Sequence, residues 1–135
     1  MNILIVLSNN VFTGVNTWAY TLTKELNSRG YIVDIEIDDG YEESNFFVKG
    51  YKEFTDKIQK VCNNIFIRDS VDYSNYKFSI ISNNFHIDKI THGKKLFVVH
   101  GTELPSFNVK GYNVDYKIGT SKTNYEYMKC DELIH

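Results

Sequence analysis

The chain has 135 residues, with 15 Lys and Arg against 17 Asp and Glu and a formal net charge of −2. This length suits a single domain, residues 1–135, and a hydrophobic content of 42% excludes a disordered chain. The charge balance makes nucleic acid an improbable partner, the two cysteines exclude a disulfide framework, and no apolar run is long enough to span a membrane. We expect a reduced, cytoplasmic domain that has at most peripheral contact with a membrane.

The first 37 residues predict a strand, a helix and a second strand. Residues 2–7 form a continuous apolar run, which is typical of a strand that is covered on both faces. Apolar side chains then recur at helical spacing from Val15 to Leu26, with Asn16 or Thr17 as the expected cap and Gly30 after the end.

Residues 31–37 alternate between apolar and polar, which predicts a strand that is half exposed or near an edge. We therefore expect Asp34 and Glu36 to face solvent.

The remaining chain alternates between strand and helix patterns. Strands are expected at residues 64–67, 76–82, 96–99 and 114–119, and helices at residues 51–62, 86–92 and 121–129. Residues 38–50 read as a loop that could contain a short strand. This alternation predicts an α/β fold with a doubly wound, mostly parallel, Rossmann-like sheet of about six strands, with residues 2–7 in a central position.

In such a sheet, ligands bind beyond the carboxyl ends of the strands. Five segments are expected there: 8–14, 38–39, 82–84, 100–103 and 120–122. Small and uncharged polar residues predominate in all of them except Asp38-Asp39. This composition suits hydrogen bonds to hydroxyls and phosphates better than a metal site. The simpler alternative is that surface loops are polar in any case.

Thr13 and Gly14 stand at the expected amino end of the first helix, where free N–H groups favour an anion. A dinucleotide fingerprint needs three glycines and this loop has one, so we do not favour an NAD site, although Asp34 lies near the expected place of a ribose-binding acid. His100 ends an apolar strand beside Gly101, where its side chain could enter the cleft. The four histidines show no metal-ligand spacing, and no nucleophile is paired with a base.

Several blocks of the sequence resemble a known family when taken in order. They are the opening strand 1–6, the turn with Thr13-Gly14-Val15, the helix and its end from Leu22 to Val33, the strand 76–84, Leu96-Phe97-Val98-Val99-His100-Gly101, and Val114-Asp115-Tyr116-Lys117-Ile118-Gly119-Thr120-Ser121-Lys122. Over nearly the whole chain this pattern resembles the amino-terminal, acceptor-side domain of GT-B glycosyltransferases, in particular the retaining, nucleotide-sugar-dependent group often called family 4.

The resemblance implies a role for each matching residue. Gly14 would lie in the glycine turn over the reaction cleft, and His100 would face the transferred sugar. The other substrate-binding positions that it implies are Thr13, Asn83, Gly101 and Ser121. It implies no metal ion. Two departures from the family pattern bear on acceptor recognition: Thr13 replaces a glycine, and Asn16 stands where a glutamate is usual.

Family members bind the nucleotide-diphosphate sugar mainly in a second, carboxyl-terminal domain, which this sequence lacks. The resemblance therefore implies the acceptor-side half of a transferase, which needs a sugar acceptor and a donor domain or subunit and is inactive alone. No catalytic residue can be assigned in this half. The alternative is a non-catalytic, stand-alone α/β module that binds a sugar, a nucleotide or a protein.

Overall fold

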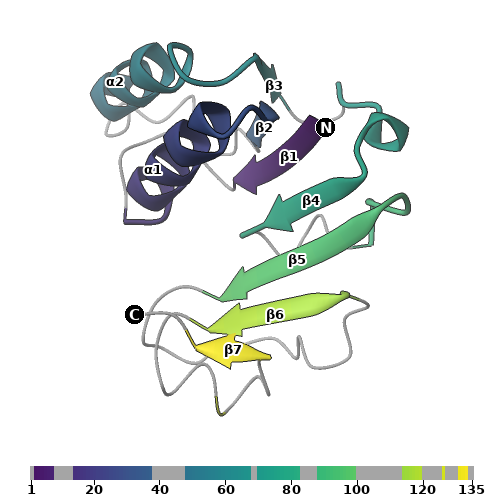
Figure 1. Ribbon diagram of the computed structural model, residues 1–135. Coiled ribbons are helices and arrows are strands. Elements are labelled where there is room, and N and C mark those ends of the chain that lie inside the picture. The colour runs from purple at the N-terminus through teal and green to yellow at the C-terminus, as the bar shows by residue number, and fades with distance from the viewer. Residues whose placement is uncertain are drawn as a thin grey trace.

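Seven parallel strands form one sheet in the computed structural model, which describes residues 2–7, 14–37, 48–67, 70–82, 88–99, 114–119, 126 and 131–133 (Figure 1). The strands are β1 (Asn2–Leu7), β2 (Ile32–Ile37), β3 (Asn64–Ile67), β4 (Phe78–Ile81), β5 (Lys94–Val99), β6 (Tyr116–Gly119) and β7 (Glu132–Leu133). The helices are α1 (Gly14–Ser28), α2 (Val48–Ile58) and the short 3-10 helix η1 (Tyr73–Asn75).

The spatial order of the strands is β3-β2-β1-β4-β5-β6-β7, and every neighbouring pair is parallel. Six strands have four or more residues, and the two-residue β7 extends the sheet beyond β6. The first six strands follow the order of a doubly wound, Rossmann-like sheet, in which strands are added on one side of β1 first and then, starting with β4, on its other side. The prediction of an α/β fold with a parallel sheet and an inner first strand is confirmed.

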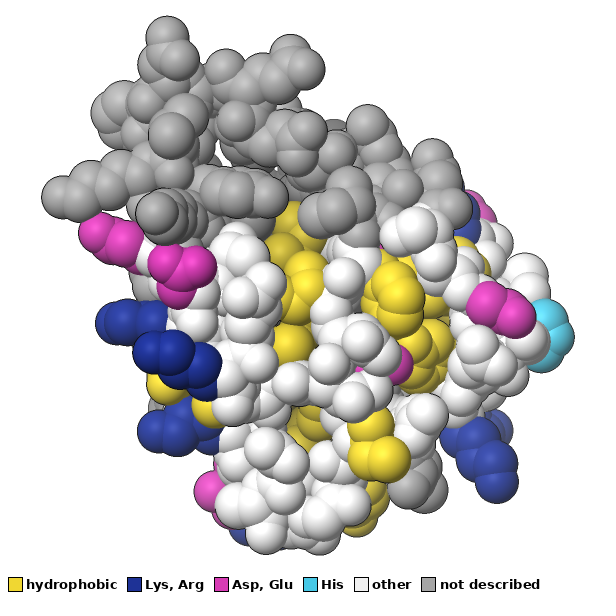
Figure 2. All heavy atoms as spheres, turned by 90° about the horizontal axis from the view of Figure 1, so that it is seen from above, with side chains coloured by type: hydrophobic (Ala, Val, Ile, Leu, Met, Phe, Trp, Pro, Cys, Tyr) yellow, Lys and Arg dark blue, Asp and Glu magenta, His cyan; other side chains and the backbone are white. Residues whose placement is uncertain are grey.

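The first strand is buried because both faces of the sheet are covered beside it. Ile3, Ile5 and Leu7 pack in the core beneath α1 and α2, which lie against the β1–β3 half of the sheet (Figure 1). Leu4 and Val6 belong to a second core on the opposite face. We call these two sides the helical face and the opposite face. Seen from above, the described surface shows hydrophobic side chains between polar ones, with most charged groups toward its edges (Figure 2).

Helix α1 follows the predicted apolar stripe, and its end follows the predicted glycine. Gly30 has φ 90°, its N–H donates to Asn27 O at 3.0 Å, and the Tyr31 N–H donates to Leu26 O at 3.1 Å. These two bonds form the usual glycine-ended helix terminus. The predicted cap is wrong, because the helix begins at Gly14 and Asn16 lies buried within its first turn.

Helix α2 is displaced from its prediction. It begins at Val48, and the helix ends at Ile58 rather than at residue 62. The predicted apolar positions Phe54 and Ile58 are fully buried against the sheet, which confirms the apolar stripe, while the predicted ends of the helix are wrong. The loop expected at 38–50 is wrong for residues 48–50, which belong to α2, and residues 38–47 lie outside the described residues.

The segment before β5 is a turn, and the helix predicted at 86–92 is wrong for the described residues 88–92. Gly93 has φ 74°, and the N–H of the next residue, Lys94, donates to Lys77 O at 2.9 Å. A left-handed glycine at this point turns the chain directly into β5. The helix predicted at 121–129 lies outside the described residues, apart from helical Glu126.

Two aspartates fix the register of the last strands in the same way. Asp115 precedes β6, donates its N–H to Lys95 O at 3.0 Å and accepts the Lys95 N–H on Oδ2 at 2.8 Å. Asp131 precedes β7 and makes the same pair of bonds with Lys117, at 2.8 and 2.7 Å. The Lys95 N–H also lowers the pKa of Asp115, with a smaller contribution from Lys94, so this carboxylate stays ionised as an acceptor.

Candidate functional site

The carboxyl ends of β1 and β4 lie side by side at the point where the order of the strands in the sheet reverses. β1 lies between β2 and β4, with Leu7 beside Ile37 and Val6 beside Ile81. Ser82, the first residue after β4, donates its N–H to Val6 O at 3.2 Å and its hydroxyl to the same oxygen at 2.9 Å. The chain that leaves β4 therefore stays bound to β1 at the place where doubly wound sheets bind ligands.

The amino end of α1 lies at the same edge of the sheet. Gly14 is the first residue of α1, and Figure 1 shows this end on the side toward which the strand arrows point. A helix amino end offers unpaired N–H groups and a partial positive charge, which together favour an anion such as phosphate. An absent side chain at Gly14 would let such a group approach the backbone.

The described residues place only part of the predicted site. Thr13, Asn83, His100, Gly101 and Ser121 all lie outside them. The strand ends that precede these residues are nevertheless in known positions: Leu7 of β1, Ser82 after β4, Val99 of β5 and Gly119 of β6. Because β1, β4, β5 and β6 are consecutive neighbours, the segments that follow these strands all start from one edge of the sheet.

The opposite face carries a buried polar cluster that the sequence analysis missed. Asp34 and Glu36 are 4% and 0% exposed, so their predicted exposure to solvent is wrong. The Tyr76 hydroxyl donates to Asp34 Oδ2 at 2.6 Å, and the Tyr73 hydroxyl donates to Glu36 Oε1 at 2.8 Å. Asn63 completes the cluster by donating from Nδ2 to Asp34 Oδ1 at 3.0 Å.

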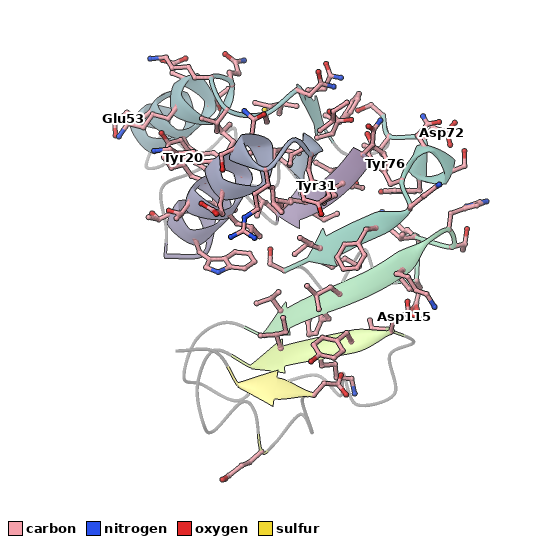
Figure 3. The ribbon with its side chains drawn as sticks, viewed as in Figure 1. Tyr20, Tyr31, Glu53, Asp72, Tyr76 and Asp115 are labelled. Atoms are coloured by element: carbon pink, nitrogen blue, oxygen red, sulfur yellow. The ribbon has the colours of Figure 1, made fainter. Side chains whose placement is uncertain are left out.

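The cluster forms because the crossover from β3 to β4 covers β2. The two tyrosines come from η1 and from the residue just after it (Figure 3), and each hydroxyl reaches one carboxylate of β2. Alternation within β2 predicts that Asp34 and Glu36 share a face, but it carries no information about what covers that face. No local signal links Tyr73 and Tyr76 to carboxylates about 40 residues earlier.

The electrostatics of the cluster indicate a structural role. Burial, and then the hydrogen bond to Asp34, raise the pKa of Tyr76, so its hydroxyl remains a proton donor at neutral pH. Burial also raises the pKa of the nearby Cys62 thiol to about 11, which keeps it protonated at neutral pH. Asp34 pairs with Leu4, three residues before the end of β1, and thus lies away from the ligand edge where a ribose-binding acid would be needed.

The described residues contain no group of three or more His, Cys, Asp and Glu side chains that could hold a metal ion. Within the same residues, no helix combines the length and apolar character needed to cross a membrane. Comparison with models of protein families, with curated proteins and with solved structures gives no match. The fold and the edge geometry thus define the class of protein: an α/β protein with a Rossmann-like parallel sheet and its candidate ligand edge at the β1–β4 junction.

Proposed function

We propose that the chain is the acceptor-side half of a retaining, nucleotide-sugar-dependent GT-B glycosyltransferase, which transfers a sugar to a glycan, lipid or other small acceptor. The observation that carries this proposal is the parallel strand order β3-β2-β1-β4-β5-β6. This order supports it because the segments that contain Gly14, Asn83 and His100 each follow a strand that ends at the same edge, next to the β1–β4 junction.

In this proposal each polar segment has a defined task. The amino end of α1 at Gly14 would face the diphosphate of the donor or the acceptor, because its N–H groups and partial positive charge stabilise a developing negative charge. His100, which directly follows β5, would contact the transferred sugar. Thr13, Asn83, Gly101 and Ser121 would supply hydrogen bonds to hydroxyl groups. No metal ion is required by this assignment.

The glycine count before α1 supports this proposal over a dinucleotide-binding one. Dinucleotide sites of doubly wound sheets use an acidic residue on the ribose, at the ligand edge. Asp34 and Glu36 of β2 are buried and bonded to Tyr76 and Tyr73, so neither can take that role, while Asp38 and Asp39, which directly follow β2, lie outside the described residues. The segment before α1 has one glycine, where a pyrophosphate-binding turn has three.

Titration of the isotope-labelled chain with a panel of nucleotide-diphosphate sugars, followed by amide NMR, tests the proposal. We expect binding in the millimolar range without transfer, because the donor would be bound mainly by the other half. Amide shifts should change at Leu7, Gly14, Ser82 and Val99, at the carboxyl ends. The amides of Gly30 and Asp115, at the opposite edge, are internal controls that should not respond.

Two results would contradict the proposal. Shift changes confined to the amino ends of the strands would place the ligand at the wrong edge. A dissociation constant near micromolar for a nucleotide sugar would show a complete binding site in this chain and would favour the stand-alone binding module.

A further inference from the structure

An open apolar groove runs over the helical face at the amino ends of the strands, away from the candidate ligand edge. It consists of two hollows of about 480 and 520 Å³ that meet at Phe78. The first lies between α1 and β4, and the second lies over β4, β5 and β6. The principal apolar side chains of this amino-end groove are Leu22, Leu26, Tyr31, Phe78, Leu96 and Tyr116.

The groove leaves large apolar side chains accessible. Tyr31 and Tyr116 are 37% and 40% exposed, at opposite ends of the groove, and Phe78 and Leu96 between them are only partly buried. Helices α1 and α2 cover β1 to β3 on this face, whereas no described helix lies over β4 to β6 (Figure 1). Aromatic side chains surrounded by polar groups are characteristic of protein interfaces.

Each end of the amino-end groove carries an exposed ion pair, and the β5–β6 end is also lined by a second base, Lys95. At the α1 end, Arg29 Nε lies 2.8 Å from Glu25 Oε1. At the β5–β6 end, Lys94 Nζ lies 3.6 Å from Asp115 Oδ1 (Figure 3). All four side chains are well exposed, with fractions from 43% to 73%. A surface with an acid and a base at both ends is complementary in charge to a second copy of itself turned by 180°.

We propose that the amino-end groove is the interface of a two-fold symmetric homodimer. Glu25 and Arg29 of each copy face Lys94 and Asp115 of the other, while the apolar side chains around Phe78 pack across the axis. This proposal goes beyond the sugar-transfer function, because the interface leaves the carboxyl ends of the strands open in both copies.

The size of the groove predicts a weak dimer. Three strand spacings of about 4.8 Å plus about 10 Å to the helix give a width of about 25 Å, and a six-residue strand spans about 20 Å. Each copy would therefore bury roughly 500 Å², or about 1,000 Å² in total, which is at the lower limit for a specific interface. We expect a reversible dimer with a dissociation constant in the micromolar range.

Sedimentation equilibrium of the 135-residue chain between about 5 and 500 μM is the first test. We expect the average mass to rise from that of the monomer toward that of the dimer within this range. A monomeric mass throughout would overturn the proposal.

Exchanging the charges of Glu25 and Lys94 tests whether these two residues face each other across the dimer interface. Lys94→Glu and Glu25→Lys, made singly, each place like charges opposite one another twice in a two-fold dimer, so each should weaken dimerisation about tenfold. The double variant restores opposite charges between copies and should return the dissociation constant to within about twofold of the original. Lys60→Glu, the same charge change at an exposed site beyond α2, is the matched control and should leave dimerisation unchanged.

Tyr116→Ser tests the apolar part at an exposed position, and circular dichroism with a thermal melt verifies that each variant is folded. We expect this variant to remain folded and monomeric at concentrations where the unchanged chain is dimeric. Dimerisation that is insensitive to Tyr116→Ser and to Lys94→Glu would place the interface elsewhere. Failure of the double variant to recover would refute the opposition of Glu25 and Lys94.

Discussion

The hydrogen bond between Tyr76 and Asp34 provides a direct test of the buried cluster. Tyr76→Phe removes the hydroxyl and keeps the ring in place against the opposite-face core. Both residues are 4% exposed, so water cannot replace the lost donor. A hydrogen bond to a charged group contributes about 1.5–3 kcal/mol, and we therefore expect the free energy of unfolding to fall by about 2 kcal/mol.

The expected loss is large enough to measure by two methods. With an unfolding entropy of about 2.1 cal/mol/K per residue, a 135-residue chain should lose about 7 °C in melting temperature. Urea unfolding at pH 7 should show a lower midpoint with an unchanged slope. Tyr20→Phe is the matched control: it removes a hydroxyl from a half-buried ring on α1, beside Lys24, and should change stability by less than about 0.5 kcal/mol.

A double-mutant cycle assigns the loss to the pair. In the Asp34→Asn background, Tyr76 donates to a neutral oxygen, so Tyr76→Phe should cost about half as much as in the unchanged chain. An equal cost in both backgrounds would show that the hydroxyl acts through another group. A Tyr76→Phe variant as stable as Tyr20→Phe would refute the argument that the cluster stabilises the fold.

Three further predictions follow from single positions. Gly93→Ala should lower the free energy of unfolding in urea by about 2–4 kcal/mol, because a Cβ would lie 2.6 Å from two backbone oxygens at φ 74°. The control Gly30→Ala, at φ 90° with nothing within 4 Å, should lower it by only about 1 kcal/mol, and equal losses in the two variants would refute the collision. Ser79→Ala should raise stability by about 1 kcal/mol, because its buried hydroxyl has no hydrogen-bond partner in the described part of the chain; a loss of stability would show that the hydroxyl is bonded. The pKa values of Tyr76 and Cys62 are raised in the fold, so the stability that comes from their protonated forms is complete below about pH 9, the ordinary thiol value, and is lost as the pH rises. Urea midpoints should therefore be constant from pH 7 to 8.5 and fall above pH 9, and this fall should be smaller in a Cys62→Ala variant.

The strands could be predicted because their signal is local. The apolar run of β1 and residues 64–67 of β3 match the structure at both ends, since a parallel strand buried on both faces needs such a run. The order of the strands agrees with the usual doubly wound arrangement. In contrast, the environment of β2 depends on Tyr73 and Tyr76, which are remote in sequence, so alternation alone wrongly predicts that Asp34 and Glu36 face solvent.

The sequence predicts at which edge of the sheet the candidate site lies, but not how its side chains are arranged. Strand ends give its position, because the carboxyl ends of parallel neighbours lie together, and the placement of Gly14 at the first residue of α1 agrees with this. The side-chain arrangement depends on the polar segments that follow the strands, whose sequences have no helical or strand periodicity. Asn16 illustrates the limit: its residue type predicts a helix cap, whereas the structure buries it within the first turn of α1.

His100 provides the test that separates a binding role from a structural one at this edge. It directly follows Val99, the last residue of β5, and β5 is the neighbour of β4 in the sheet. A histidine that contacts a sugar contributes little to packing, and His100→Ala should weaken the NMR-detected binding of nucleotide sugars at least fivefold. It should shift the melting temperature by less than about 1 °C. His92→Ala, at an exposed histidine before β5, is the matched control and should affect neither quantity. If His100→Ala instead lowers the melting temperature strongly while the folded fraction binds as before, His100 is structural and the ligand site must be sought among other residues.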